Sequence, residues 1–237
     1  MLFTLLQITT GAVPDSTVAA TDATATTTPE SVSLIDLAMA GGWAMIPLLI
    51  LSLAAIYIFT ERFLALKKAG GANSMAFVDK IKQMVLAGDI NGAKMLCAKT
   101  NSPVSRMLQK GISRIGNPLK DIEAAIENVG KIEVSGLEKN LSALATVAGA
   151  APMLGFLGTV TGMIQAFIAI AQAEGSVSPK LLSSGIYEAM VTTAAGLIIG
   201  LPAYVGYNYL VAKTDKIVHT MEYSAIEFMD LLQEPQV

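Results

Sequence analysis

Three long apolar stretches constrain what this chain can fold into. They cover residues 37–60, 141–173 and 181–212, and each is longer than the roughly 20 residues that an α-helix needs to cross a bilayer. Glu188 is the only acidic or basic side chain within them. Charged side chains make up 15% of the whole chain, whereas soluble domains carry about 25%. The sequence therefore predicts an all-α integral membrane protein with three transmembrane helices.

The basic residues indicate which segments lie on the same side of the membrane. None of the 16 Lys and Arg residues lies in the first 60 positions, and 13 of them fall between Arg62 and Lys139. Two more follow the third stretch, which leaves only Lys180 in the short loop before it. Because cytoplasmic loops carry the excess of Lys and Arg, we expect the N-terminus outside and the C-terminus inside, with Glu61 and Arg62 closing the first span.

These assignments predict an alternating domain organisation. The first part of the chain is rich in Thr, Ala, Pro and Ser, a composition that cannot bury a core, and we expect a leader that is either disordered or signal-like. The predicted segments, in order, are this exterior leader (1–36), transmembrane helix 1 (37–60), a cytoplasmic helical domain (61–140), transmembrane helix 2 (141–173), an exterior loop (174–180), transmembrane helix 3 (181–212) and a cytoplasmic C-terminal helix and tail (213–237).

The cytoplasmic domain shows the apolar spacing of three and four residues that is typical of amphipathic helices. This spacing predicts three short helices and a longer one after them, at 75–86, 90–98, 103–115 and from Pro118. Because the next proline is Pro152, the longer helix can run on into the second span. The third span can likewise continue from Pro179 to Leu232. Helices 2 and 3 of the membrane are therefore expected to extend into a cytoplasmic helical bundle.

Small residues mark one face of the second span. They recur three and four residues apart at Gly155, Gly158, Thr159 and Gly162. Residues at this spacing share a helix face, and a face of small residues lets two helices approach closely in lipid. Helix packing alone accounts for the glycines, whereas the hydroxyl of Thr159 adds a polar group to that face. Pro152 in this span and Pro202 in the third are expected to kink their helices.

Glu188 has two threonines close to it in the third span. Thr192 is four residues further along and shares its helix face, whereas Thr193 lies about 140° away around the helix. Gly196 and Gly200 extend the face of Thr192. The acid is either exposed to water at the outer interface or faces an internal polar path. Its depth, about 12 Å beyond the last basic residue before it at 1.5 Å per residue, favours the polar path.

A single acid restricts what these spans can do. They contain no histidine, no metal-ligand cluster and no Ser/His or paired-acid arrangement, so we expect no enzyme activity, no cofactor and no metal site. A proton path usually needs several titratable groups. We therefore predict a homo-oligomer, embedded in membrane lipids with its polar face turned inward, and a partner that brings a second carboxylate. Nucleic acid is not expected as a partner.

Several short segments, read in order, carry a resemblance to a known family. They are Gly41-Gly42-Trp43 with Pro47, Glu61-Arg62, the Gly88-Asp89 turn, Ala151–Gly162 and Glu188–Ala203. With the three spans, they make residues 37–232 resemble the ExbB members of the MotA/TolQ/ExbB proton-channel family. The Gly-Thr-Val-x-Gly core and the Glu-Ala-x-x-x-Thr-Ala-x-Gly-Leu segment are jointly specific, although neither is strong alone.

The resemblance implies a pentameric ring in the bacterial inner membrane, with a periplasmic N-terminus and a cytoplasmic C-terminus. It also implies that an ExbD-like single-span partner with a membrane Asp sits in the pore, and that a TonB-like transducer passes the work of proton flow to outer-membrane transporters. By motif position, Thr159 and Thr193 match pore-lining threonines and Glu188 matches the family's membrane glutamate. Helix geometry instead places Thr192 beside Glu188, so both threonines are candidates.

Other functions stay open on the sequence alone. A TolQ-like subunit of an envelope-integrity motor is the nearest rival, and the exterior leader favours an ExbB-like role over it. A flagellar stator subunit is less consistent, because the resemblance there would imply four spans. A non-conducting membrane scaffold, in which Glu188 only packs or binds a partner, is the alternative from another functional class.

Overall fold

The computed structural model describes residues 41–70, 74–172 and 179–233, and within these ranges the chain is helical. The helices are α2 (Met45–Ala69), α3 (Ser74–Leu86), α4 (Ile90–Lys99), α5 (Pro103–Ile112), α6 (Leu119–Glu138), α7 (Leu141–Gln172) and α8 (Pro179–Gln233). The predicted leader, the first residues of the first span and most of the 174–180 loop lie outside the described residues. The predicted all-α fold is confirmed.

Three helical segments are long and apolar enough to cross a membrane, namely α2, the α6–α7 pair and α8. α8 has 55 residues, which corresponds to about 80 Å of helix at 1.5 Å per residue. This length exceeds the thickness of a bilayer of about 40–45 Å, so that α8 continues well beyond the membrane. The predicted continuation of the third span to Leu232 is therefore confirmed.

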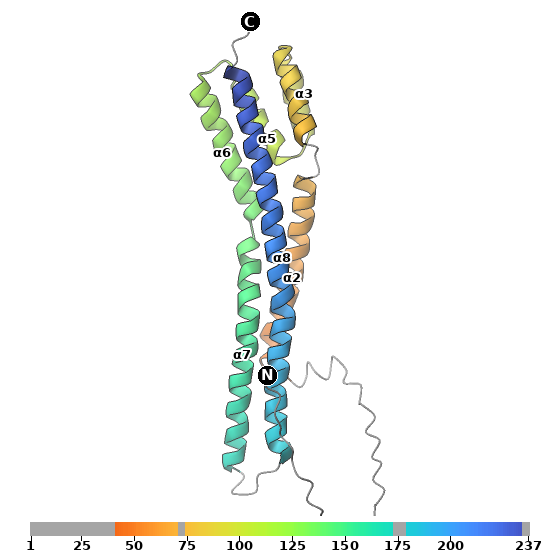
Figure 1. Cartoon of the computed structure of the whole chain (residues 1–237), viewed down its shortest axis with the longest axis vertical. Coiled ribbons are helices and arrows are strands. Elements are labelled where there is room, and N and C mark those ends of the chain that lie inside the picture. Colours follow the sequence, from red (N-terminus) through yellow and green to blue (C-terminus); the bar gives the residue numbers. More distant parts are fainter. Residues whose placement is uncertain (1–40, 71–73, 173–178, 234–237) are drawn as a thin grey trace, which may run out of the picture. The chain divides into compact units, whose positions relative to one another are not determined.

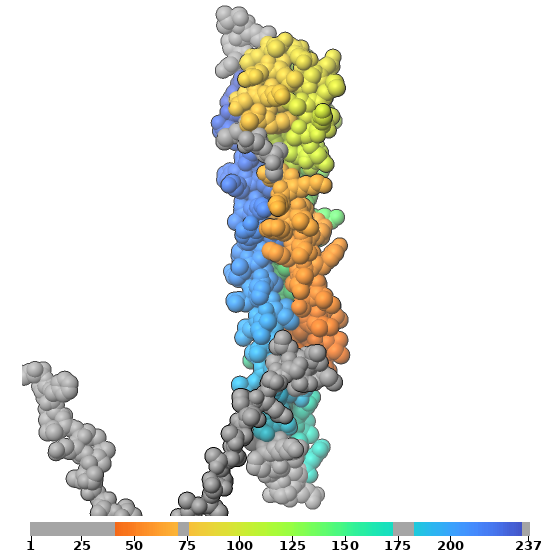
Figure 2. Space-filling model, turned by 90° about the vertical axis from the view of Figure 1, so that its right-hand side faces the viewer, coloured from red at the N-terminus to blue at the C-terminus, as the bar shows by residue number. Residues whose placement is uncertain are grey.

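α7 runs beside one end of α8, and α2 packs against both of these helices (Figure 1). Figure 2 shows α2, in orange, lying along α8, in blue. Aromatic rings join α2 to α8: Phe63 stacks on Phe59 at 6.0 Å and on Tyr209 of α8 at 6.2 Å between ring centroids. The Lys213 ammonium lies 4.8 Å from the centre of the Phe63 ring, a cation–π contact that holds the two helices together where the apolar stretch of α8 ends.

Helices α3 to α6 pack around the other end of α8 (Figure 1). Their starts follow local signals: Asp89 caps α4 by accepting a hydrogen bond from the Gly92 amide at 2.8 Å, and Ser102 forms a capping box with Ser105. Phe228 of α8 is fully buried among them. A Cβ on Gly111 of α5 would lie 3.0 Å from the Phe228 ring, so that the glycine lets α5 approach α8 closely.

Two ion pairs tie the outer faces of this bundle together. Lys82 of α3 pairs with Glu227 of α8 at 2.9 Å, and Arg106 of α5 pairs with Glu133 of α6. The hydrogen bonds that Arg106 donates to Glu133 raise the pKa of the guanidinium above its usual value. The first pair links helices that are far apart in sequence and the second links consecutive helices, so that α3 is held against α8 and α5 against α6.

The structure corrects one junction that was predicted from the sequence. α6 does not run on into α7, because Asn140 adopts a left-handed conformation with φ 63° and breaks the helix. Glu61 and Arg62, which the sequence places at the end of the first span, lie within α2. Arg62 is buried and donates to the Gly136 carbonyl at the end of α6 at 3.3 Å, while Asn140 Nδ2 donates to Glu61 Oε2 at 3.3 Å. The two charged residues thus hold the α6–α7 junction, and α2 continues past them to Ala69.

Candidate functional site

Glycines bring α7 and α8 into backbone contact. The buried glycines that line this contact come from both helices: Gly155, Gly158, Gly162, Gly196 and Gly200. A Cβ added to Gly196 would lie 2.6 Å from the carbonyl oxygen of Ala151 and 3.0 Å from the Cα of Gly155. Because these are backbone atoms, the helices reach this distance only with glycine at the contact. We call this contact the α7–α8 seam.

Pro152 and Pro202 both lie inside helices, the first in α7 and the second in α8. The ring of Pro152 is at the seam, where a Cβ on Gly200 would meet its Cγ and Cδ at 2.6 Å. Proline has no amide hydrogen, so the Ala148 carbonyl four residues earlier has no helical donor at this position. Pro202 is exposed on the surface of α8.

The Glu188 carboxylate lies against Gly42, in the turn that precedes α2. A Cβ added to Gly42 would overlap Glu188 Oε1, and Gly42 has a positive φ of 60° that side chains rarely adopt. Within the described ranges, no Lys, Arg or His forms an ion pair with Glu188. The acid is half-buried and close to the amino end of α2, where the helix dipole favours a negative charge.

Thr192 of α8 is enclosed between α7 and the turn that precedes α2. It is 1% exposed, and its side chain fills the space beside Gly158 of α7 and near Gly41, where an added Cβ would lie 3.3 Å from Thr192 Cγ2. Its hydroxyl donates to the carbonyl of Ala189 at 2.8 Å, with a longer contact of 3.3 Å to the Glu188 carbonyl. Thr192 therefore shares the face of Glu188, as predicted from their spacing, but its hydroxyl is turned to its own helix.

Thr193 makes the hydrogen bond that crosses the seam. Its Oγ1 donates to the Gly155 carbonyl of α7 at 3.0 Å. Unlike Thr192, the side chain is half-buried rather than enclosed. The hydroxyl of Thr159, one helical turn beyond Gly155, donates to the Phe156 carbonyl of its own helix at 2.6 Å, and this side chain is also half-buried.

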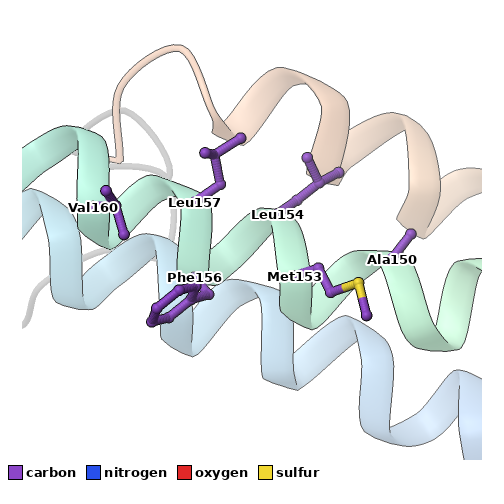
Figure 3. Close-up of a pocket in the computed structure, with 6 residues that line it drawn as sticks. All are labelled: Ala150, Met153, Leu154, Phe156, Leu157 and Val160. Atoms are coloured by element: carbon purple, nitrogen blue, oxygen red, sulfur yellow. The ribbon is translucent and has the colours of Figure 1, made fainter.

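The predicted polar residues fall on two sides of the seam. Leu154 and Leu157 of α7 reach toward α2 in Figure 3. At 100° per residue, Thr159 lies about 140° from Leu154 and about 160° from Leu157 around the helix, and it therefore points away from α2. On α8, Glu188 faces the start of α2, and Thr193 lies about 140° from it. Glu188 and Thr192 are thus on the side of α2, whereas Thr159 and Thr193 are on the side away from it. We call the latter side the threonine face.

The other surface of α7 at this level is apolar. A shallow hollow of about 470 Å³ is lined only by Ala150, Met153, Leu154, Phe156, Leu157 and Val160, all drawn in Figure 3. Such a surface is compatible with lipid chains or with another apolar helix. No group of three or more His, Cys, Asp or Glu side chains that could hold a metal ion occurs among the described residues.

Sequence reasoning missed the contribution of the α2 start to this site. Gly41-Gly42 was noted among the motifs that carry the family resemblance, but its contact with Glu188 and Thr192 joins segments that are far apart in the chain. The consecutive glycines near the start of the first apolar stretch were the available signal, because they mark a place where another group approaches the backbone closely.

The sequence pattern of the MotA/TolQ/ExbB proton channel family matches residues 99–223, just over half of the chain. The biopolymer transport protein exbB1 of Vibrio cholerae is 41% identical over 87 residues, which are 35% of this chain and 38% of the relative. The Tol-Pal system protein TolQ of Haemophilus influenzae is 38% identical over 85 residues, 36% of this chain and 37% of the relative. A biopolymer transport ExbB homologue of Methanothermobacter thermautotrophicus is 25% identical over 162 residues, 68% of this chain and 57% of the relative.

The matched region contains the whole seam and the threonine face. The matches cover between 37% and 57% of the length of these three relatives. The family match confirms the resemblance that the sequence motifs indicated, and it agrees with the three apolar helices of a multi-pass membrane protein. This chain belongs to the MotA/TolQ/ExbB proton channel family.

Proposed function

We propose that this chain is a subunit of a proton-driven motor in the bacterial inner membrane, and that it couples the proton motive force to TonB-dependent outer-membrane transport. Its membership of a proton channel family supports the conducting role. The relatives include biopolymer transport proteins, which supports transport as the process that is driven. The observation that carries the proposal is the threonine face, together with an acid on the other side of the seam that has no cationic partner among the described residues.

The threonine face is suited to line a proton path that other chains complete. Thr159 and Thr193 are half-buried in the single chain and lie on the side away from α2. Their hydroxyls can solvate a proton or a neutral carboxylic acid without adding fixed charge. Fixed positive charge at the same place would oppose proton entry. We therefore propose that Thr159 and Thr193 face the pore, and that the enclosed Thr192 does not.

Glu188 has a tuning role in this proposal rather than the role of proton carrier. It is the only acid of the three spans, and its carboxylate lies against Gly42 on the α2 side of the seam. A single acid on one wall cannot complete a relay. We propose that a single-span, ExbD-like partner brings the aspartate that carries the proton, inside a homo-oligomeric ring, as the family resemblance implies.

The basic residues support an orientation with the N-terminus in the periplasm and the C-terminus in the cytoplasm. Of the 16 Lys and Arg residues, all but Lys180 lie in segments 61–140 and 213–237, and Lys and Arg are enriched on the cytoplasmic side. In this orientation the helices α3 to α6 lie in the cytoplasm. We further propose that the chain acts in conduction and not as an enzyme, because its spans lack paired acids and a Ser/His arrangement.

Proton flux in proteoliposomes tests the proposal. The chain is reconstituted with a single-span partner that has a membrane Asp, a membrane potential is applied, and a pH-sensitive dye inside the vesicles reports proton entry. We expect Glu188→Ala and Thr159→Ala each to abolish partner-dependent flux while the oligomer stays assembled. Thr146→Ala is the matched control, because Thr146 is an exposed α7 threonine whose hydroxyl bonds only its own helix.

Two outcomes would redirect the proposal. Undiminished flux in both variants would reject a role of Glu188 and Thr159 in conduction, and the absence of flux in the parent protein with its partner would favour a non-conducting scaffold. The match to TolQ makes an envelope-integrity motor the second candidate. Expression in a strain without its own ExbB-type and TolQ-type subunits separates the two, because only the first role restores outer-membrane uptake and only the second restores detergent resistance.

A further inference from the structure

A groove of about 840 Å³ lies between α6 and α8, on the part of the molecule that the proton path does not use. These two helices are seen beside each other at the C-terminal end of α8 in Figure 1. Three methionines line the groove, Met107 from α5 and Met221 and Met229 from α8, together with Ile126 and Ile226. Ile226 is 60% exposed, so that apolar surface faces water here.

Acidic side chains surround this apolar floor. They come from both helices: Glu123, Glu127 and Glu138 from α6, and Glu222 and Asp230 from α8. The basic residue that lines the groove, Lys131, is already paired with Glu127 at 2.7 Å. Glu123, Glu138 and Asp230 are exposed, and none of them forms an ion pair within the described part of the chain. The groove therefore carries an excess of negative charge.

The chemistry of the groove specifies its occupant. Methionine side chains are flexible and polarisable, and they adapt to apolar residues of different shapes. An amphipathic helix places apolar anchors in such a groove and its charged face along the rims. Acidic rims favour Lys and Arg on that helix, and they repel anionic lipid headgroups.

A second copy of this chain matches the groove less well than a separate amphipathic helix would. Three basic residues of its bundle, Lys82, Arg106 and Lys131, are committed to ion pairs within the chain. The apolar residues of α5 are buried in the chain's own core, and in α4 the large apolar side chain that stays exposed is Met95. We propose that the α6–α8 groove is a docking site for a basic amphipathic helix of a partner protein on the same side of the membrane.

Peptide binding to the full-length chain in a neutral detergent tests this proposal without any proton gradient, so that its outcome is separate from the flux experiment. The probe is a fluorescein-labelled 16-residue amphipathic helix of Leu and Lys, and its twin has Glu in place of Lys. We expect fluorescence anisotropy to show saturable, salt-sensitive binding of the Lys peptide only. The variant Glu123→Gln/Asp230→Asn should weaken it at least tenfold, whereas Asp79→Asn/Asp215→Asn, which removes the same charge outside the groove, should leave it unchanged.

A steric variant and a cross-link locate the bound peptide. A Cβ on Gly130 meets only Met107 Sδ, at the ordinary distance of 3.4 Å, so Gly130→Leu should fold and fill the groove, which weakens binding at least tenfold. A photo-reactive residue in place of Ile226 should cross-link to the peptide. Equal affinity for parent and groove variants, binding of the Glu peptide with equal strength, or a cross-link from position 226 to a second copy of the chain would each overturn the proposal.

Discussion

Thr192 and Thr193 are adjacent in α8, but their hydroxyl groups form different kinds of hydrogen bond. Thr193 bonds across the seam to the Gly155 carbonyl, whereas Thr192 bonds only carbonyls of its own helix. Hydrogen bonds between membrane helices contribute about 0.6 kcal/mol on average, and a threonine bonded within its own helix contributes little to the contact between helices. Of the two threonines, Thr193 is therefore the one expected to contribute more to the stability of the seam.

We predict that Thr193→Val lowers the free energy of unfolding by about 0.5–1.5 kcal/mol, because it removes the bond and leaves the Gly155 carbonyl without this donor. Thr192→Val, which keeps the volume of an enclosed side chain, should change it by less than about 0.5 kcal/mol. Unfolding with a denaturing detergent, followed by circular dichroism, measures both variants. A larger loss for Thr192→Val would contradict the contacts described here.

The same pair of variants separates stability from conduction. Thr193 lies on the threonine face, so Thr193→Val should also reduce partner-dependent proton flux, and more severely than Thr192→Val. The Thr159→Ala variant provides the comparison, because it lies on the same face without a bond across the seam. Equal and negligible effects of both valine variants on flux would show that neither threonine lines the path.

At the scale of the helices, the close approach of α7 and α8 depends on which glycines meet backbone atoms. A Cβ on Gly155 would lie 2.9 Å from the Thr192 carbonyl oxygen and 3.1 Å from the Thr193 Cα. Gly149, in the same helix, has no atom within 4 Å of an added Cβ. The two positions have the same helical conformation and differ in their surroundings, which makes them a matched pair.

We predict that Gly155→Ala destabilises the protein by about 1–3 kcal/mol, because backbone atoms must separate to admit the methyl group. Gly149→Ala should be neutral or stabilise the helix by up to about 1 kcal/mol, since alanine has the higher helix propensity. The measurement is the midpoint of thermal unfolding in detergent. A stable Gly155→Ala protein with unchanged Thr193 interactions would contradict the backbone contact at the seam.

Local signals predicted the short helices of the bundle closely. The sequence predicted a helix over 90–98 and the structure has Ile90–Lys99, because Asp89 and the glycine before it act within a few residues of the helix start. The prediction over 103–115 was right at its start, where Ser102 caps the helix, and three residues too long at its end. Signals of this kind are visible in one short segment.

Features that depend on distant segments were not predicted. The break between α6 and α7 involves Arg62 and Glu61 of α2, which bond Gly136 and Asn140, and no pattern near residue 140 shows this. For the same reason, the spacing of the third span indicated that Glu188 and Thr192 share a face but not that this face meets the turn before α2. Helix periodicity defines faces, and only tertiary packing decides what each face contacts.

At the scale of the whole described molecule, one apolar core connects the spans to the bundle. The buried cluster extends from Ala55 and Leu66 of α2 through Leu144 and Leu210 to Phe228 near the end of α8. α8 contributes to both regions, so that a change in packing at the seam and a change in the bundle act on one continuous helix. The reactivity of a single buried side chain, used as a probe, can show whether local unfolding of the seam and of the bundle occurs together.

Cys97 is such a probe, because it is the only cysteine of the chain and is 1% exposed in the core. Burial raises the pKa of the Cys97 thiol from 9.0 to about 11. Below pH 9 the thiol is neutral in both the folded and the unfolded chain and has no effect on stability. Between pH 9 and about 11 the unfolded thiol ionises first, so that stability declines as pH rises through this range. Cys97→Ala should lack this decline.

We predict that iodoacetamide alkylates Cys97 at pH 9 at least roughly 50-fold more slowly in the folded protein than in denaturant, because a pKa near 11 leaves that much less thiolate. Mass spectrometry of timed samples measures the rate. Phe228→Ala, which removes a fully buried ring from the same cluster, should accelerate labelling at least tenfold, whereas Ile226→Ala at an exposed position of the same helix should not.

The Gly155→Ala variant tests whether the seam and the bundle are coupled. Faster labelling of Cys97 in this variant would show that loosening the seam opens the bundle through α8, and an unchanged rate would show that the two regions open separately.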